Sequence, residues 1–147
     1  MQFKIILFAT DFSESSDYAF QYALAMARQF DARLALLHVI NEPVDLRGFY
    51  VPHISFKKLE EEIAQGACKM MEKFCRSHLG DYANFETHVE PGIPYDEIIS
   101  KGQKIDADLI VMGTHGRTGL DHMLFGSTTE KVVRKSPIPV MTIRFQE

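Results

Sequence analysis

The stretch VMGTHGRTGLDHMLFGSTTEKVVRK, residues 111–135, decides the fold because it joins a strand to a helix through an unusually glycine-rich loop. Its glycines are Gly113, Gly116, Gly119 and Gly126. Glycine loses more conformational freedom on folding than any other residue, so this density indicates a backbone that turns sharply or approaches something closely. Loops this long without a core pattern are usually functional.

The residues that flank the loop support a strand–loop–helix unit. Residues 108–112 are a short apolar run typical of a buried strand. Ser127 and Glu130 have the spacing of a capping box, which predicts that a helix begins there. Glycines before a helix N-terminus let main-chain N–H groups converge on a phosphate. The same glycines could instead only shape a long turn, with Ser127 only capping the helix.

Two common nucleotide motifs do not occur in the chain. The P-loop pattern G-x-x-x-x-G-K-[ST] and the dinucleotide pattern G-x-G-x-x-G have no match anywhere. A phosphate site in this loop would therefore have to use a different arrangement.

Apolar strands alternate with amphipathic helices along the whole sequence. The predicted strands cover residues 3–9, 33–40, 85–90, 108–112 and 138–144, and the predicted helices run from Ser13 to about 30, over 56–79, over 92–105 and from 127. This alternation predicts a parallel sheet with helices on both faces. Ligands of such sheets bind beyond the carboxyl ends of the strands, so ATDFS, VINEP and MGTHGRTG are the candidate site loops.

Composition limits the classes of protein that this chain can represent. Its 147 residues fit one domain, and 46% hydrophobic with 24% charged residues is typical of a soluble globular protein. A net charge of −4 argues against a nucleic-acid surface, and no apolar run reaches the roughly 18 residues of a membrane span. The N-terminal MQFKIILFATDF resembles a strand more than a signal peptide, so we expect a cytoplasmic protein.

The two cysteines are predicted to be free thiols. Cys68 and Cys75 are seven residues apart on a predicted helix, about 10 Å by helical rise. A disulfide tolerates Cα atoms about 7 Å apart at most, so these residues fit a reducing compartment.

The glycine spacing resembles a known family motif. The pattern Gly113-x2-Gly116-x9-Gly126-Ser127 is similar to G-2x-G-9x-G-(S/T), the nucleotide-binding motif in the ATP-binding branch of the universal stress protein family. Similar stretches extend along the chain: ATDFS, LLHVINEP, GIPYDEII, DLIVMGTHGRTG and SPIPVMTIR. The resemblance implies one universal stress protein domain over 1–147, an α/β flavodoxin-like doubly wound sheet of five parallel strands in the order 3-2-1-4-5, and helices on both faces.

The resemblance also implies a set of ligand-binding residues. Asp11 would lie beside adenine and ribose, Val39 would offer backbone groups to the adenine edge, and the helix start would hold the phosphates. The full predicted set is Ala9, Thr10, Asp11, Val39, Met112, Gly113, Gly116, Arg117, Gly126, Ser127 and Thr128. The ligand would be ATP, or AMP or ADP, with Mg²⁺ carried mainly by the phosphates and water.

Several of these residues have a simpler interpretation. Asp11 could only cap the helix that follows it. His115 and His122 are expected to face water, since neither has a visible orienting partner. Arg117 is the better phosphate candidate because it is always charged and multidentate. His38 and His88 are expected to be packed or rim residues of strands.

Three classes of function remain open at this stage. The leading one is an ATP-binding regulatory or stress-response module, a homodimer through its last strand, with an unknown protein partner. The second is a slow ATPase or a nucleotidyl- or phosphoryl-transferring enzyme, although the H-x-G-H and S-G-G-x-D-S motifs of such enzymes are missing and no catalytic residue is predicted. The third is an interaction domain without nucleotide, against which the intact glycine spacing argues.

Overall fold

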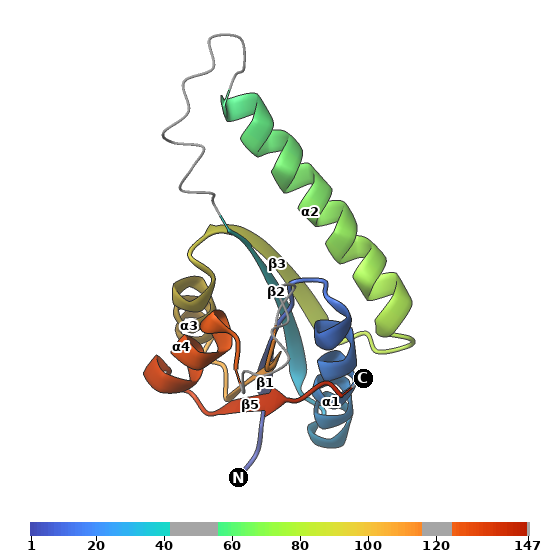
Figure 1. Cartoon of the computed structure of the whole chain (residues 1–147). Coiled ribbons are helices and arrows are strands. Elements are labelled where there is room, and N and C mark those ends of the chain that lie inside the picture. The colour runs from blue at the N-terminus through green and yellow to red at the C-terminus, as the bar shows by residue number, and fades with distance from the viewer. Residues whose placement is uncertain (42–55, 116–124, 147) are drawn as a thin grey trace.

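Five parallel strands in the order β3-β2-β1-β4-β5 form the centre of the protein, as predicted (Figure 1). The computed structural model describes residues 1–41, 56–115 and 125–146. The elements in these residues are β1 (Ile5–Ala9), α1 (Glu14–Phe30), β2 (Arg33–Asn41), α2 (Phe56–His78), β3 (Phe85–Gly92), α3 (Pro94–Lys104), β4 (Leu109–Gly113), α4 (Ser127–Lys135) and β5 (Val140–Ile143).

The side chains of β1 alternate between two separate hydrophobic clusters. Ile6 and Phe8 point to the face covered by α1 and α2, while Leu7 and Ala9 point to the face covered by α3 and α4. Ile6, Leu7 and Phe8 have no exposed surface, because a parallel sheet with helices on both faces buries its central strand completely. Helices thus cover both faces of the sheet, as the sequence predicted.

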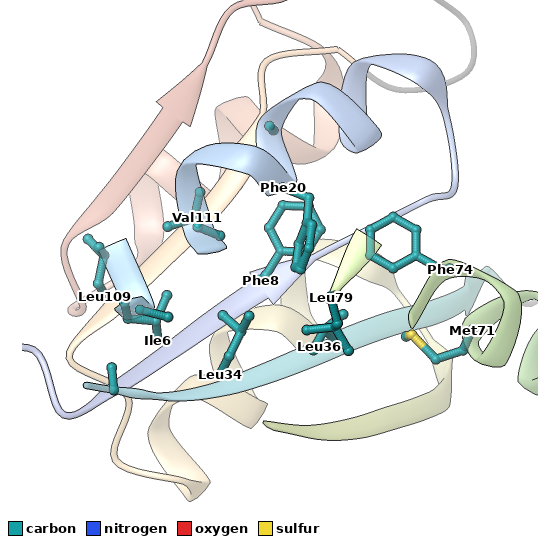
Figure 2. Packing of buried hydrophobic residues seen from close by; sticks show 14 residues of the cluster. Ile6, Phe8, Phe20, Leu34, Leu36, Met71, Phe74, Leu79, Leu109 and Val111 are labelled. Atoms are coloured by element: carbon teal, nitrogen blue, oxygen red, sulfur yellow. The ribbon is translucent and has the colours of Figure 1, made fainter. Parts of the chain in front are cut away.

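Aromatic rings fill the cluster between the sheet and the first two helices (Figure 2). Phe20 of α1 and Phe74 of α2 lie edge to face with ring centroids 5.1 Å apart, and Phe8 of β1 lies 5.1 Å from Phe20. Edge-to-face pairs of this kind stabilise a core beyond the area they bury. Phe74 therefore anchors the C-terminal half of α2 to the sheet.

Helix α2 is the longest helix among the described residues and carries both cysteines. They are free thiols in the structure: Cys68 is exposed and Cys75 is half-buried, and burial raises the pKa of the Cys75 thiol. No helix within 1–41, 56–115 or 125–146 is long and apolar enough to cross a membrane.

Several predicted boundaries shift by one to a few residues, including those of the first and last strands in the sequence. Strand β1 begins at Ile5 and not at residue 3, because the N–H groups of Lys4 and Ile5 donate to the Asp108 carboxylate at 2.8 and 3.0 Å. Strand β5 begins at Val140 and not at residue 138, directly after Pro139, which has no N–H to donate.

The predicted capping box at α4 is wrong by one residue. Gly126, not Ser127, is the N-cap, and its carbonyl accepts from the Glu130 N–H at 3.0 Å. Gly126 is held in that place by its own N–H, which donates to the Thr114 carbonyl at 2.7 Å. Ser127 is therefore the first residue of the helix, and its N–H belongs to the unpaired first turn.

Candidate functional site

A cavity of about 620 Å³ lies at the carboxyl ends of β1, β2 and β4, within the usual range for small-molecule sites. The predicted site residues that the structure describes all line it: Ala9, Thr10, Asp11, Val39, Met112, Gly113, Gly126, Ser127 and Thr128. The predictions for Gly116 and Arg117 lie outside the described residues. Residues up to 119 positions apart in the chain are thus brought to one place by the parallel strands.

The turn after β1 is fixed by side-chain hydrogen bonds. The Thr10 hydroxyl accepts from the Phe12 N–H at 2.9 Å and from the Ser16 hydroxyl at 2.7 Å. Phe12 has a φ of 63°, a left-handed conformation that a non-glycine residue adopts only when its surroundings impose it. These contacts fix the backbone that carries Asp11.

Asp11 lines the cavity and also belongs to this turn. Its Oδ1 accepts from the Ser13 N–H at 3.0 Å. Ser13 is the N-cap of α1 and accepts from the Ser16 N–H at 3.2 Å, so the helix is capped without Asp11. The simpler interpretation of Asp11 as the helix cap is therefore wrong, and its carboxylate is placed at the cavity.

The main chain of Val39 points beyond the end of β1. The Leu37 carbonyl accepts from the Thr10 N–H at 2.9 Å, so Leu37 presents its backbone groups to β1. Backbone groups alternate sides along a strand, and Val39 therefore presents its N–H and C=O in the same direction as Leu37. Strand β1 ends at Ala9, opposite Leu37, so these groups lie next to the cavity and not next to a strand.

His38 forms part of the rim of the cavity. A ring nitrogen, Nδ1, lies 2.8 Å from the Thr10 carbonyl oxygen, and the ring lies 4.4 Å from that of Phe12. The prediction of a packed or rim histidine is confirmed. His115 also lines the cavity and is half-buried, with Nδ1 3.0 Å from the Thr114 hydroxyl oxygen, so its ring has an orienting partner that the sequence did not reveal.

The opposite side of the cavity is the N-terminus of α4. The Thr129 hydroxyl donates to the Gly113 carbonyl at 2.8 Å and ties the first turn of α4 to the end of β4. Ser127 and Thr128 line the cavity, and their N–H groups have no partner within the helix. Such a turn carries a partial positive charge and binds anions.

Among the described residues that line the cavity there is no lysine or arginine, and Asp11 is the one carboxylate. In the same described part of the chain, no cluster of three or more His, Cys, Asp or Glu could hold a metal ion. In the described part of the site, an anion would therefore be bound by a helix N-terminus and not by a lysine or arginine side chain.

Sequence reasoning missed one wall of the cavity. Helix α2 contributes Ile63, Gly66, Ala67 and Met70, and α3 contributes Pro94 and Ile98. The sequence predicts a helix over 56–79 but does not place any of its residues at the site. A glycine in the middle of a long helix was the one signal of another role.

The fold is that of a flavodoxin-like α/β protein, and the cavity lies where the winding of the sheet reverses, the usual position of ligand sites in such folds. The chain belongs to the universal stress protein family, since the family model described as "Universal stress protein family" matches residues 2–144.

Individual relatives agree with this assignment. The chain is 33% identical to universal stress protein MJ0531 of Methanocaldococcus jannaschii, over 97% of this chain and 82% of that protein. The solved structure of MJ0577, from the same organism, is 31% identical with a TM-score of 0.86, covering 100% of this chain and 99% of the other. A universal stress protein in complex with cAMP shares the fold with a TM-score of 0.62 at 22% identity, over 98% of each chain.

Gly113 lies at a close approach between β4 and α1, which suggests a test. A Cβ at Gly113 would lie 3.0 Å from the Ser15 hydroxyl oxygen, and that oxygen is buried with no hydrogen-bond partner among the described residues. We expect Gly113→Ala to lower the free energy of unfolding by about 1–2 kcal/mol through overpacking. Chemical denaturation of the unaltered protein and of Gly113→Ala measures this difference in the free energy of unfolding.

Ser15→Ala supplies the matched control. Removing a buried hydroxyl without a partner should leave stability unchanged or higher, and should relieve most of the loss in the double variant with Gly113→Ala. Equal losses from Gly113→Ala with and without Ser15→Ala would show that this contact does not explain the glycine.

Proposed function

We propose that this protein is an ATP-binding regulatory module of the universal stress protein family, whose output depends on the nucleotide it holds. The observation that carries the proposal is the cavity itself. It brings the backbone of Val39, the carboxylate of Asp11 and the first turn of α4 around one space of about 620 Å³. These groups match, in order, the base, the ribose and the phosphates of a nucleotide.

The base is proposed to bind the main chain of Val39. Adenine places a donor, the N6 amino group, beside an acceptor, N1, on its Watson–Crick edge. A backbone C=O and N–H from one residue complement that pair, and they lie beyond the end of β1. The Asp11 carboxylate can accept from ribose hydroxyls, because its turn holds it at the cavity.

The phosphates are proposed to bind the N-terminus of α4. The N–H groups of Ser127 and Thr128 and the helix dipole favour negative charge there. Gly116 and Arg117 are proposed to complete this end of the site. Mg²⁺ would bind mainly through phosphate oxygens and water, since the described residues offer no metal cluster.

The comparison with solved structures supports the choice of ligand class. The relative determined in complex with cAMP has the same fold, so this fold accommodates an adenine nucleotide in that protein.

The cellular compartment that we propose is the cytoplasm, where the free thiols Cys68 and Cys75 would stay reduced.

The first test compares ATP binding by two neighbouring variants. Gly126→Val should weaken binding at least about tenfold, or about 1.4 kcal/mol, because a branched side chain at the helix mouth obstructs the phosphates. Gly126 has a φ of −69°, which any residue adopts, so this change introduces no backbone strain. Ser127→Ala should weaken binding less, because the backbone donors remain. Isothermal titration calorimetry measures the dissociation constant of ATP for the unaltered protein and for both variants.

Each outcome of this comparison is informative. If Gly126→Val, shown to be folded by circular dichroism, binds ATP as the unaltered protein does, the phosphate site lies elsewhere. If the unaltered protein binds no ATP, the protein is an interaction domain without nucleotide.

The rate of ATP hydrolysis distinguishes a regulatory module that only binds ATP from an ATPase. Hydrolysis needs an oriented water and positive charge placed for the transition state, and the described lining of the cavity holds neither a lysine nor a second carboxylate. Binding without contacts specific to the transition state gives affinity and little rate. We expect hydrolysis well below about 1 s⁻¹, the low end of ordinary enzymes. A faster Mg²⁺-dependent rate that Gly126→Val abolishes would establish an ATPase.

We propose that the protein forms a homodimer through β5. This strand is at one edge of the sheet and pairs only with β4 among the described strands, and its four residues are all partly exposed. An unpaired strand edge of this kind favours pairing with another chain. Sedimentation should therefore show a dimer at micromolar concentration with ATP present, and Thr142→Pro, which removes a donor from β5, should weaken it. A monomer under these conditions would contradict the proposal.

A further inference from the structure

Helix α2 carries a glycine at its centre that packing within the described protein does not require. Gly66 is the eleventh residue of a helix of 23. Glycine is less favourable than alanine in a helix interior, since it loses more backbone freedom. A Cβ built on Gly66 meets no atom within 4 Å. The space in front of Gly66 is part of the cavity.

Four residues of α2 shape this space, and we call them the α2 notch: Ile63, Gly66, Ala67 and Met70. Their spacing of three, four and seven places them on one helix face. Gly66 and Ala67 are small residues and form the bottom of the α2 notch. The larger side chains of Ile63 and Met70 lie about one helical turn before and after them. The exposed fractions of Ile63 and Met70 are 38% and 42%.

The exposure of the α2 notch contrasts with the rest of the inward face of the helix. Met71 and Phe74, one turn further on, are 2% and 5% exposed and belong to the core. The N-terminal half of α2 projects past the carboxyl end of β2 (Figure 1). The α2 notch thus faces the cavity where the sheet no longer lies beneath the helix.

The cavity has two chemically different ends. Helix α2 packs against β2 and β3, whereas the N-terminus of α4 is tied to the end of β4 through Thr129 and Gly113. Strand β1 lies between these two sides in the sheet order. A ligand whose anionic group binds α4 therefore extends across β1 toward Val39 and the α2 notch, which is apolar.

We infer that the α2 notch receives the flat face of the nucleotide base. Gly66 lets a planar ring approach the helix backbone, and Ile63 and Met70 cover the edges of the ring, with the Met70 sulfur available for an aromatic contact. The base would then lie between α2 and the backbone of Val39. This inference rests on the proposed function, and it assigns the base end of the site to a helix that the glycine motif does not include.

A size series at Gly66 tests the inference. Gly66→Leu should raise the dissociation constants of ATP and of adenosine at least about tenfold, because its side chain fills the space of the ring. The same variant should bind inorganic tripolyphosphate as the unaltered protein does. Gln65→Leu is the matched control: it adds the same group at the adjacent, exposed position, which does not line the cavity, and should leave ATP binding within about twofold.

Gly66→Ala should move stability and affinity in opposite directions. Alanine favours the helix, so the thermal midpoint of the free protein should rise by about 2–4 °C. Its methyl group enters the space of the ring, so ATP should bind about threefold more weakly. A purely structural glycine would not combine a gain in stability with a loss of affinity.

Ile63→Ala covers the case in which Gly66→Leu does not fold. Ile63 is exposed, so its truncation should leave the fold intact and weaken ATP binding about fivefold. Unchanged ATP binding by folded Gly66→Leu, or by Ile63→Ala and Gly66→Ala together, would overturn the inference while the proposed function stands. Absence of ATP binding by the unaltered protein would overturn both.

Discussion

The double pairing of β1, with β2 on one side and β4 on the other, is the constraint on which the rest of the structure depends. The chain leaves β1 to build β2 and β3 with α1 and α2 on one face, and then crosses to build β4 and β5 with α3 and α4 on the other. The segments after β1 and β4 must therefore diverge, since their helices cover opposite faces. That divergence opens the cavity, and strand β1 ends early enough for the backbone of Val39 to face it.

The core and the candidate site share residues, so neither is built independently of the other. Val39 and Met112 are buried in the cluster beneath α3 and α4, yet both line the cavity. On the opposite face, Phe12 connects the turn that carries Asp11 to the aromatic core, because its ring contacts both His38 and Phe74. The polar groups of the site are therefore held by packing on both faces of the sheet, which is the preorganisation that a binding site needs.

The fold was predictable from sequence because apolar strands alternate with amphipathic helices along the whole chain. The resemblance to the family supplied the strand order. The errors have local causes: Asp108 pairs with the start of β1, and the Thr114 carbonyl fixes Gly126 as the cap of α4. The wall formed by α2 was missed, because its glycine was the one signal and periodicity does not interpret it. Helical periodicity identifies an apolar face, but it does not reveal that the helix extends beyond the sheet, so Ile63 and Phe74 look alike in sequence and differ in burial.

The separation of the hydrophobic side chains into two clusters has a consequence for how a ligand enters and leaves. Helix α4 packs on the sheet through Val132 in the cluster beneath α3 and α4, whereas the aromatic cluster beneath α1 and α2 contains no residue of α4. Loosening of α4 therefore breaks contacts on one face only. Sub-global opening of this kind costs less than global unfolding. A nucleotide bound at α4 as proposed would thus be exchanged by fluctuation of α4 and its cluster, while the aromatic cluster preserves the sheet and keeps the turn of Asp11 in place.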